Sequence, residues 1–178
     1  MKLPSTSLLA AALAALPLAA ASATFTAVVT RVSDGDTLWL RADDPSAKPF
    51  KLRLQGIDAP ERCQPWGPEA AAALAERVLL RQVQVHTRAR DDYQRSLGNI
   101  HLGDEDISAW MVAQGHAWSY RYRRHGGPYA AQEDEARARR RGLFADGHAM
   151  QPRLFRQMNG PCDEARRATS PSPVEAAQ

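Results

Sequence analysis

The residues best suited to chemistry lie between Arg53 and Glu61, in the stretch Arg-Leu-Gln-Gly-Ile-Asp-Ala-Pro-Glu. Arg53, Asp58 and Glu61 place one guanidinium and two carboxylates close together along the chain. A guanidinium donates to phosphate oxygens as a fork, and a carboxylate binds a metal ion or takes up a proton. The combination suits chemistry on a phosphate group. The simpler alternative is a strand that ends in a polar turn with a surface ion pair, and this stretch alone favours that alternative.

A second acidic motif, Asp-Gly-Asp-Thr at positions 34–37, changes this balance. Asp-Gly between two alternating runs is a strong hairpin signal, but the hairpin leaves Asp36 unexplained. If the hairpin and the strand of Arg53 share one sheet, Asp36 approaches Asp58. Two close carboxylates repel each other unless a proton or a cation lies between them. Oxygen ligands without nearby Cys or His indicate calcium or magnesium rather than zinc.

The polarity pattern predicts the elements that position these residues. Five short runs alternate between apolar and polar residues, as half-buried strands do. A helix that opens at Gly67-Pro68-Glu69 interrupts the strands after the third, and two more helices are expected. The five runs are 25–32, 37–41, 50–54, 82–88 and 97–102, and the later helices are one capped by Asp106 and one from about Tyr129 to Arg141. The acids and arginines of the last helix are expected to form a solvated face.

A third motif, Asp91-Asp92-Tyr93-Gln94-Arg95, completes a recognisable set. With the motifs at 34–37 and 53–61, it resembles the staphylococcal nuclease-like (thermonuclease) family in order and spacing, from about residue 24 to residue 144. The resemblance implies an α+β fold, a five-stranded OB-type β-barrel with three packed helices. It also implies a phosphodiesterase, an endonuclease that cuts DNA and RNA with little sequence specificity and leaves 3′-phosphates.

The resemblance further implies roles for individual residues. Two arginines bind the phosphate and stabilise its transition state, a glutamate is the general base that activates water, and two aspartates with one backbone carbonyl bind Ca²⁺. The arginines are Arg53 and Arg95, and the general base is Glu61. The calcium ligands are Asp36, Asp58 and the carbonyl of Ala59. The chain departs from the family pattern at two positions: Gln94 replaces the usual Gly, and Ala59 replaces the Thr of the best-known member.

Three tyrosines are candidates for binding the bases of a substrate. Tyr120 and Tyr122 alternate with arginines, so an extended segment places both rings on one face. Stacking of a base on such a ring is worth about 1–3 kcal/mol. The alternative is one buried aromatic with a solvated basic rim. The resemblance favours binding, because it places nucleotide-contacting tyrosines here and at Tyr93.

The two ends of the chain differ from its middle. Residues 1–23 have a basic start, a short apolar run and a small-x-small site, which predict a signal peptide; an uncleaved membrane anchor is the alternative. We therefore expect a periplasmic or secreted protein without stable membrane association. Residues 24–156 form the nuclease-like domain, and residues 157–178 form an extension that ends in a mostly disordered tail. In an oxidising compartment, Cys63 and Cys162 are expected to form a disulfide rather than remain free thiols.

The overall charge of the chain says little about its function. The chain carries a formal charge of +3, and 20 of its 23 basic residues are Arg, which agrees with DNA and RNA substrates but also follows from GC-rich codons. We expect a monomer. Two other functions compete with the enzyme: a non-catalytic nucleic-acid-binding module on the same barrel, and an exported structural protein. Asp36 and Asp58 favour the enzyme, because without a cation they would repel phosphate.

Overall fold

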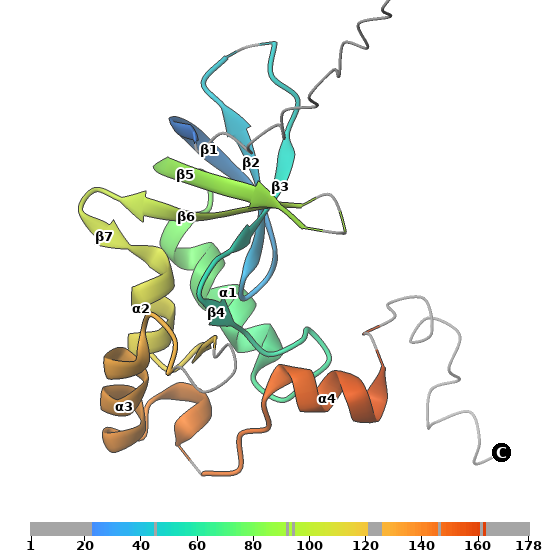
Figure 1. Cartoon of the computed structure of the whole chain (residues 1–178), viewed down its shortest axis with the longest axis vertical. Coiled ribbons are helices and arrows are strands. Elements are labelled where there is room, and N and C mark those ends of the chain that lie inside the picture. The colour runs from blue at the N-terminus through green and yellow to red at the C-terminus, as the bar shows by residue number, and fades with distance from the viewer. Residues whose placement is uncertain are drawn as a thin grey trace, which may run out of the picture.

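The computed structural model describes residues 23–160 and 162, except residues 45, 92, 94, 121–125 and 146. Its centre is a barrel of five strands, with the helices gathered toward one end (Figure 1). The barrel strands are β1 (Ala23–Asp34), β2 (Thr37–Ala42), β3 (Phe50–Leu54), β5 (Gln82–Arg90) and β6 (Ser96–Leu102). They are hydrogen-bonded in the order β3-β2-β1-β5-β6, and a parallel pairing of β3 with β6 closes the ring. The predicted OB-type barrel is confirmed.

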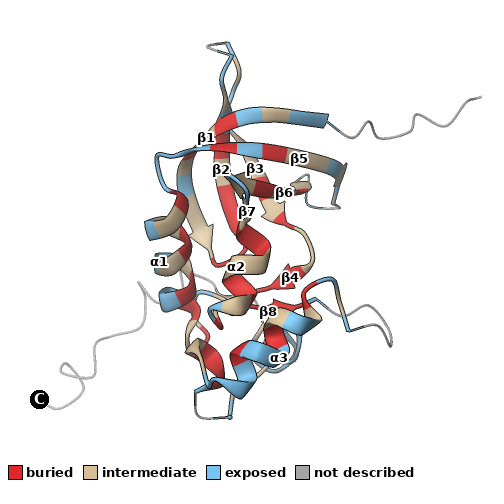
Figure 2. Cartoon of the chain, turned by 90° about the vertical axis from the view of Figure 1, so that its left-hand side faces the viewer, coloured by how far each residue is buried: buried red, intermediate tan, exposed pale blue. Residues whose placement is uncertain are grey.

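Alternation of apolar and polar residues gives the barrel its core. Leu38 and Leu40 of β2 and Leu52 of β3 point inward and are fully buried, whereas the residues between them are more exposed. Figure 2 shows such buried positions gathered where the barrel meets α1 (Gly67–Val78) and α2 (Ile107–Ala113). Two irregularities in the β1–β2 register lie near the end of β1, and irregularities of this kind bend and twist a strand.

The three predicted helices are present. α1 packs Ala70, Leu74 and Val78 against the barrel, and α2 is capped by Asp106, whose carboxylate accepts hydrogen bonds from the next turn. α3 (Ala130–Ala138) lies against α2 and is followed by the short 3₁₀ helix η1 (Gly142–Phe144). Among the described residues, no helix has both the length and the apolar character needed to cross a membrane.

α3 differs from the predicted solvated face. Glu133 is fully buried, where it accepts a hydrogen bond from the backbone N–H of Ser119 at 2.9 Å and pairs with Arg137 at 2.7 Å. The exposed pair Glu135–Arg139 does form as expected, at 3.1 Å. Buried Glu133 therefore ties α3 to the chain just before Tyr120, which the sequence pattern did not show.

Two further features were not predicted. A fourth helix, α4 (Pro152–Asn159), spans residue 156, the expected end of the domain. It is short, only Pro152 of its residues is buried, and Leu154 and Met158 are exposed, so its apolar side chains do not join the core. Three two-residue strands also form: β7 (Glu105–Asp106) pairs antiparallel with the end of β6, and β4 (Ile57–Asp58) pairs with β8 (Trp118–Ser119) in a separate ribbon.

Candidate active site

Asp36 is positioned by the turn between β1 and β2. Asp34 pairs with Thr37, so Gly35 and Asp36 form the turn itself. A Cβ atom on Gly35 would lie 2.7 Å from the Cβ of Ala59, which shows how closely the turn packs. Asp36 is only 3% exposed; its Oδ2 accepts from the N–H of Ala59 at 3.1 Å and its Oδ1 from the hydroxyl of Thr37 at 2.9 Å.

Arg53 lies on β3 opposite Thr37 and joins the two aspartates. Its Nη1 donates to Asp36 Oδ1 at 2.5 Å, and its Nη2 donates to Asp58 Oδ1 at 3.0 Å. Burial acts to lower the pKa of Arg53, but the carboxylates of Asp36 and then Asp58 outweigh it and raise that pKa. Arg53 is therefore a permanent cation held between two acids.

Asp58 lies in the two-residue strand β4, although a strand followed by Gly56 and Pro60 predicts a turn or loop at this position. Gln55 and Gly56 make the turn instead, and the chain then re-enters a short strand in which Asp58 pairs with Trp118. Burial and the neighbouring Asp36 raise the pKa of Asp58, although Arg53 acts in the opposite direction. The predicted approach of Asp36 and Asp58 is thus present, with the mutual repulsion that two close carboxylates must have.

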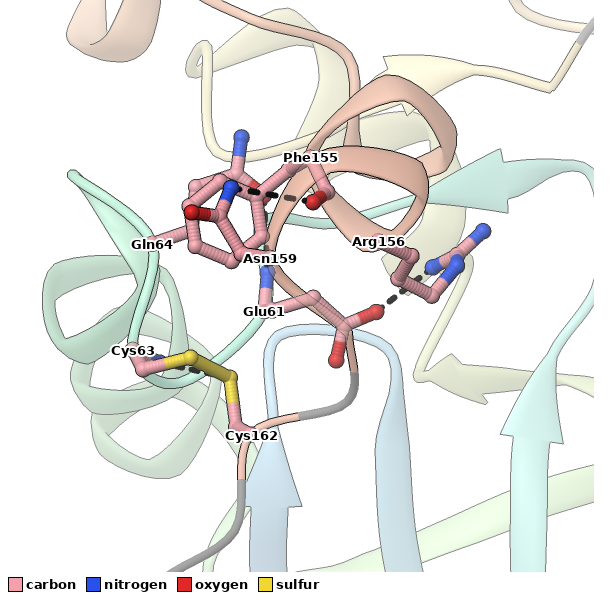
Figure 3. The surroundings of a disulfide bond; sticks show 7 residues. All are labelled: Glu61, Cys63, Gln64, Phe155, Arg156, Asn159 and Cys162. Atoms are coloured by element: carbon pink, nitrogen blue, oxygen red, sulfur yellow. Dashed lines mark hydrogen bonds and ion pairs between the residues drawn. A yellow bond between two sulfur atoms is a disulfide. The ribbon is translucent and has the colours of Figure 1, made fainter. Parts of the chain in front are cut away.

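Glu61 follows two residues after Ala59, at the start of a tight loop that leads into α1. Gln64 holds this loop: its side-chain Oε1 accepts from the N–H of Glu61 at 3.2 Å, and its own N–H donates to the Glu61 carbonyl at 2.8 Å. Gly67 is required here, because a Cβ would lie 1.9 Å from that carbonyl oxygen. The Glu61 carboxylate accepts a hydrogen bond from Arg156 of α4 at 2.5 Å (Figure 3).

Arg95 is held by Asp91 at the start of β6. Asp91 accepts from the backbone N–H of Arg95 at 2.9 Å and from its Nε at 2.7 Å. Slight burial acts to raise the pKa of Asp91, but these hydrogen bonds lower it. The guanidinium of Arg95 also lies over the ring of Tyr93, 5.4 Å from its centre. Gln94, where the chain departs from the family pattern, lies outside the described residues.

Of the three predicted base-binding tyrosines, the two that the structure describes lie at the surface. Tyr93 is 82% exposed and Tyr120 is 49% exposed. The N–H of Tyr120 donates to the Gly56 carbonyl at 2.8 Å, which fixes its backbone beside β4. Tyr122 lies outside the described residues, so its placement stays a prediction.

One cleft of about 1350 Å³ brings the site together. Its lining includes every described residue predicted for catalysis, metal binding or substrate binding: Asp36, Arg53, Asp58, Ala59, Glu61, Tyr93, Arg95 and Tyr120. The cleft lies on the side of the barrel formed by β3, β5 and β6, next to β4. A cleft with two arginines, neighbouring carboxylates and exposed aromatic rings can bind a nucleotide and act on its phosphate.

Sequence reasoning missed three groups that line the cleft. Asp34 was assigned only to the hairpin, but burial and the adjacent Asp36 raise its pKa to about 7. Tyr129 donates through its hydroxyl to Asp106 at 2.8 Å, and burial raises its pKa to about 12. Arg156 reaches the site from the C-terminal end of the chain, and only the predicted disulfide hinted that this segment lies nearby.

The disulfide itself is present. Cys63 and Cys162 are bridged; they are 99 positions apart in the sequence, and their Cα atoms are 5.7 Å apart. The bridge joins the loop after Glu61 to the chain beyond α4 (Figure 3). The predicted disulfide is therefore confirmed.

The carboxylates of the site are ligands of the type that a hard cation prefers, but they do not form a complete coordination shell. Among the described residues, no three His, Cys, Asp or Glu side chains converge as a metal cluster. Asp36 and Asp58 offer carboxylate oxygens at one place, and Ca²⁺ accepts six to eight oxygen ligands that include carbonyls and waters. The donor set thus suits Ca²⁺ if backbone, water and phosphate oxygens complete it.

Comparison with known proteins identifies the family. The model of the staphylococcal nuclease homologue family matches residues 51–146, which include Arg53, Asp58, Glu61 and Arg95. A micrococcal nuclease of Shigella flexneri is 36% identical over 148 residues, 76% of this chain and 82% of the relative. The chain belongs to the staphylococcal nuclease family.

Other relatives extend the likeness beyond the matched residues. Protein ParB of Escherichia coli is 39% identical over 160 residues, 83% of this chain and 89% of the relative. An uncharacterized endonuclease of Haemophilus influenzae is 34% identical over 129 residues, 72% of this chain and 71% of the relative. Membership of the staphylococcal nuclease family makes this chain a hydrolase, an endonuclease with nucleic acid as its substrate.

Proposed function

We propose that this member of the staphylococcal nuclease family is an exported, calcium-dependent endonuclease that cuts DNA and RNA with little sequence specificity and leaves 3′-phosphates. The observation that supports this most is the bridging of Asp36 and Asp58 by Arg53 at one end of a cleft that also holds Glu61 and Arg95. A protein that only binds nucleic acid gains nothing from buried acids facing phosphate. A nuclease needs them.

Calcium is proposed to bind at Asp36 and Asp58, with the carbonyl of Ala59 as a further ligand. Burial makes these two carboxylates costly to hold side by side, as the raised pKa of Asp58 shows, and a divalent cation removes that cost. Ala59 lacks a hydroxyl, so its contribution is limited to the backbone. When bound, calcium supplies positive charge next to the phosphate under attack.

The chain's own groups carry the reaction. Glu61 takes a proton from water, whose oxygen attacks the phosphorus; the bond to the 5′-oxygen breaks, and that oxygen takes up a proton and leaves as a hydroxyl. Arg53 and Arg95 donate to the phosphate oxygens and stabilise the charge that grows there. Removing a donor of this kind typically lowers the rate by about 10²–10³.

Substrate choice follows from the contacts available. Guanidinium groups that bind phosphate carry no base code, and rings such as those of Tyr93, Tyr120 and Tyr122 stack on any base. The exposed rings of Tyr93 and Tyr120 need an unpaired base to stack on. Single strands should therefore be cut faster than intact duplex, and equal rates on a matched panel of both would contradict this.

Export and oligomeric state are also proposed rather than observed. The basic and apolar start of residues 1–23 and the Cys63–Cys162 disulfide both support a periplasmic or secreted protein without stable membrane association. We propose in addition that it is a monomer. Fractionation of cells that express the full chain, with a check of whether residues 1–23 are removed, tests the export.

The function is tested by digesting single-stranded DNA with the protein in Ca²⁺ and in EGTA, beside Glu61→Gln. We expect cleavage that needs Ca²⁺, produces 3′-phosphate ends and falls by at least about 10²-fold in the variant. A folded wild type that binds DNA but does not cut it would instead support the non-catalytic binding module.

A further inference from the structure

Arg156 of α4 extends into the active site from a distant part of the sequence. Its Nη1 donates to Glu61 Oε1 at 2.5 Å (Figure 3). Its Nη2 lies 3.7 Å from Asp58 Oδ2. The other oxygen of Asp58 accepts from Arg53. Asp58 therefore lies between two guanidinium groups, and the proposed general base is paired with the second of them.

Two tethers hold the α4 segment at this place. Gln64 donates through Nε2 to the carbonyl of Met150, just before α4, while its Oε1 binds the backbone of Glu61. Beyond α4, the Cys63–Cys162 disulfide joins the same loop. Because Pro152 is the only buried residue of α4, whose residues are all described, these tethers rather than an apolar face set its position.

The charge balance indicates what Arg156 does. Asp36, Asp58 and Glu61 form a group of three carboxylates with Arg53, which pairs with the two aspartates and returns one positive charge. With one divalent cation bound, this group would be neutral without Arg156 and carries a net positive charge with it. A phosphodiester is an anion, so Arg156 makes this side of the cleft attractive to it.

The Arg156–Glu61 pair is also suited to exchange. The Arg156 side chain is 40% exposed, and an ion pair with that exposure gains little net stability because water screens it. A phosphate oxygen accepts the same fork of donors equally well. When a phosphate takes Arg156, the Glu61 oxygen that had been paired becomes available to water.

We propose that Arg156 is a third phosphate-binding arginine, which contacts the substrate backbone beside the scissile phosphate on the Glu61 side, and that the Cys63–Cys162 disulfide positions it. The inference rests on the proposed nuclease function. Arg53 and Arg95 face the reacting phosphate, so the Arg156 contact is made in the ground state and the transition state alike. Its loss is therefore expected to raise KM and leave kcat nearly unchanged.

The test compares Arg156→Gln, Arg156→Lys and the control Arg153→Gln, which removes an exposed arginine of the same helix that does not line the cleft. Cleavage of a short single-stranded DNA in Ca²⁺ gives kcat and KM. Binding of the same DNA in EGTA, at several salt concentrations, gives the slope of log K against log salt. Urea unfolding of each variant shows that it is folded.

Arg156→Gln is expected to raise KM on the order of tenfold, with kcat within about twofold of the wild type. It should also make the salt slope shallower by about 0.7, the value for one phosphate contact on a single strand. Arg156→Lys should keep the wild-type slope, and Arg153→Gln should change neither KM nor slope. An unchanged slope and KM in Arg156→Gln, or a faster enzyme, would overturn the proposal, because Arg156 would then only pair with Glu61.

Two further comparisons complete the test. If the wild type binds DNA in EGTA but cuts nothing in Ca²⁺, the nuclease function fails while the salt slopes still decide the role of Arg156. Replacing both cysteines by serine should raise KM as Arg156→Gln does, and should add nothing in the Arg156→Gln background. If the cysteine replacements raise KM by the same factor in the wild type and in Arg156→Gln, the disulfide does not act through Arg156.

Discussion

Arg53→Gln is expected to destabilise the protein as well as inactivate it. The substitution removes two charge-assisted hydrogen bonds, at 2.5 and 3.0 Å, from carboxylates that are 3% and 7% exposed. Removing one partner of a buried ion pair leaves an uncompensated charge and typically costs about 3–5 kcal/mol. Arg53 itself is 21% exposed, so we expect the lower part of this range, about 3 kcal/mol.

Urea unfolding in EGTA, followed by circular dichroism, measures this loss. The matched control is Arg139→Gln, which breaks an exposed pair with Glu135 at 3.1 Å and should cost less than about 1 kcal/mol. Addition of Ca²⁺ should restore more stability to Arg53→Gln than it adds to the wild type, because the cation relieves the repulsion between Asp36 and Asp58. A loss no larger than that of the control, or equal calcium stabilisation of both proteins, would refute the reasoning that Arg53 neutralises this pair.

Three other outcomes are expected. Asp91→Asn should lower kcat about tenfold or more, because the Arg95 guanidinium loses the carboxylate that aims it; kinetics with unchanged kcat would argue against this role. Reducing the disulfide between Cys63 and Cys162 should lower the free energy of unfolding by up to about 4.7 kcal/mol in the chain-entropy model, seen as a lower urea midpoint with dithiothreitol. The folded state raises the pKa of Tyr129 to about 12 from about 10, so its neutral form stabilises the fold below pH ~10 and this contribution is lost as the pH rises toward 12. Unfolding midpoints across that range should fall less steeply for Tyr129→Phe than for the wild type.

The sequence determined the barrel strands and the motif residues. Alternation in stretches such as 37–41 and 50–54 fixes which side chains face the core, because a strand that is half-buried has a period of two. Residues near in the chain, such as Arg53 and Asp58, are brought together by a single turn. The approach of Asp36 to Asp58 also followed, since a hairpin and its neighbouring strand leave little freedom in register.

Only the tertiary structure decided the contacts between distant segments. Arg156 lies 95 positions from Glu61, and the pattern of an eight-residue helix with one buried residue does not show which distant segment it contacts. The sequence predicted a solvated Glu133, because its spacing to Arg137, one helical turn away, is typical of an exposed ion pair. The same spacing also fits a buried glutamate that contacts β8, which is what the structure shows. Asp58 likewise entered a strand because Trp118 supplies a partner for its backbone. Local sequence patterns determine which residues can form a helix or strand. Which other segment packs against it depends on residues far along the chain, and a local pattern carries no information about them.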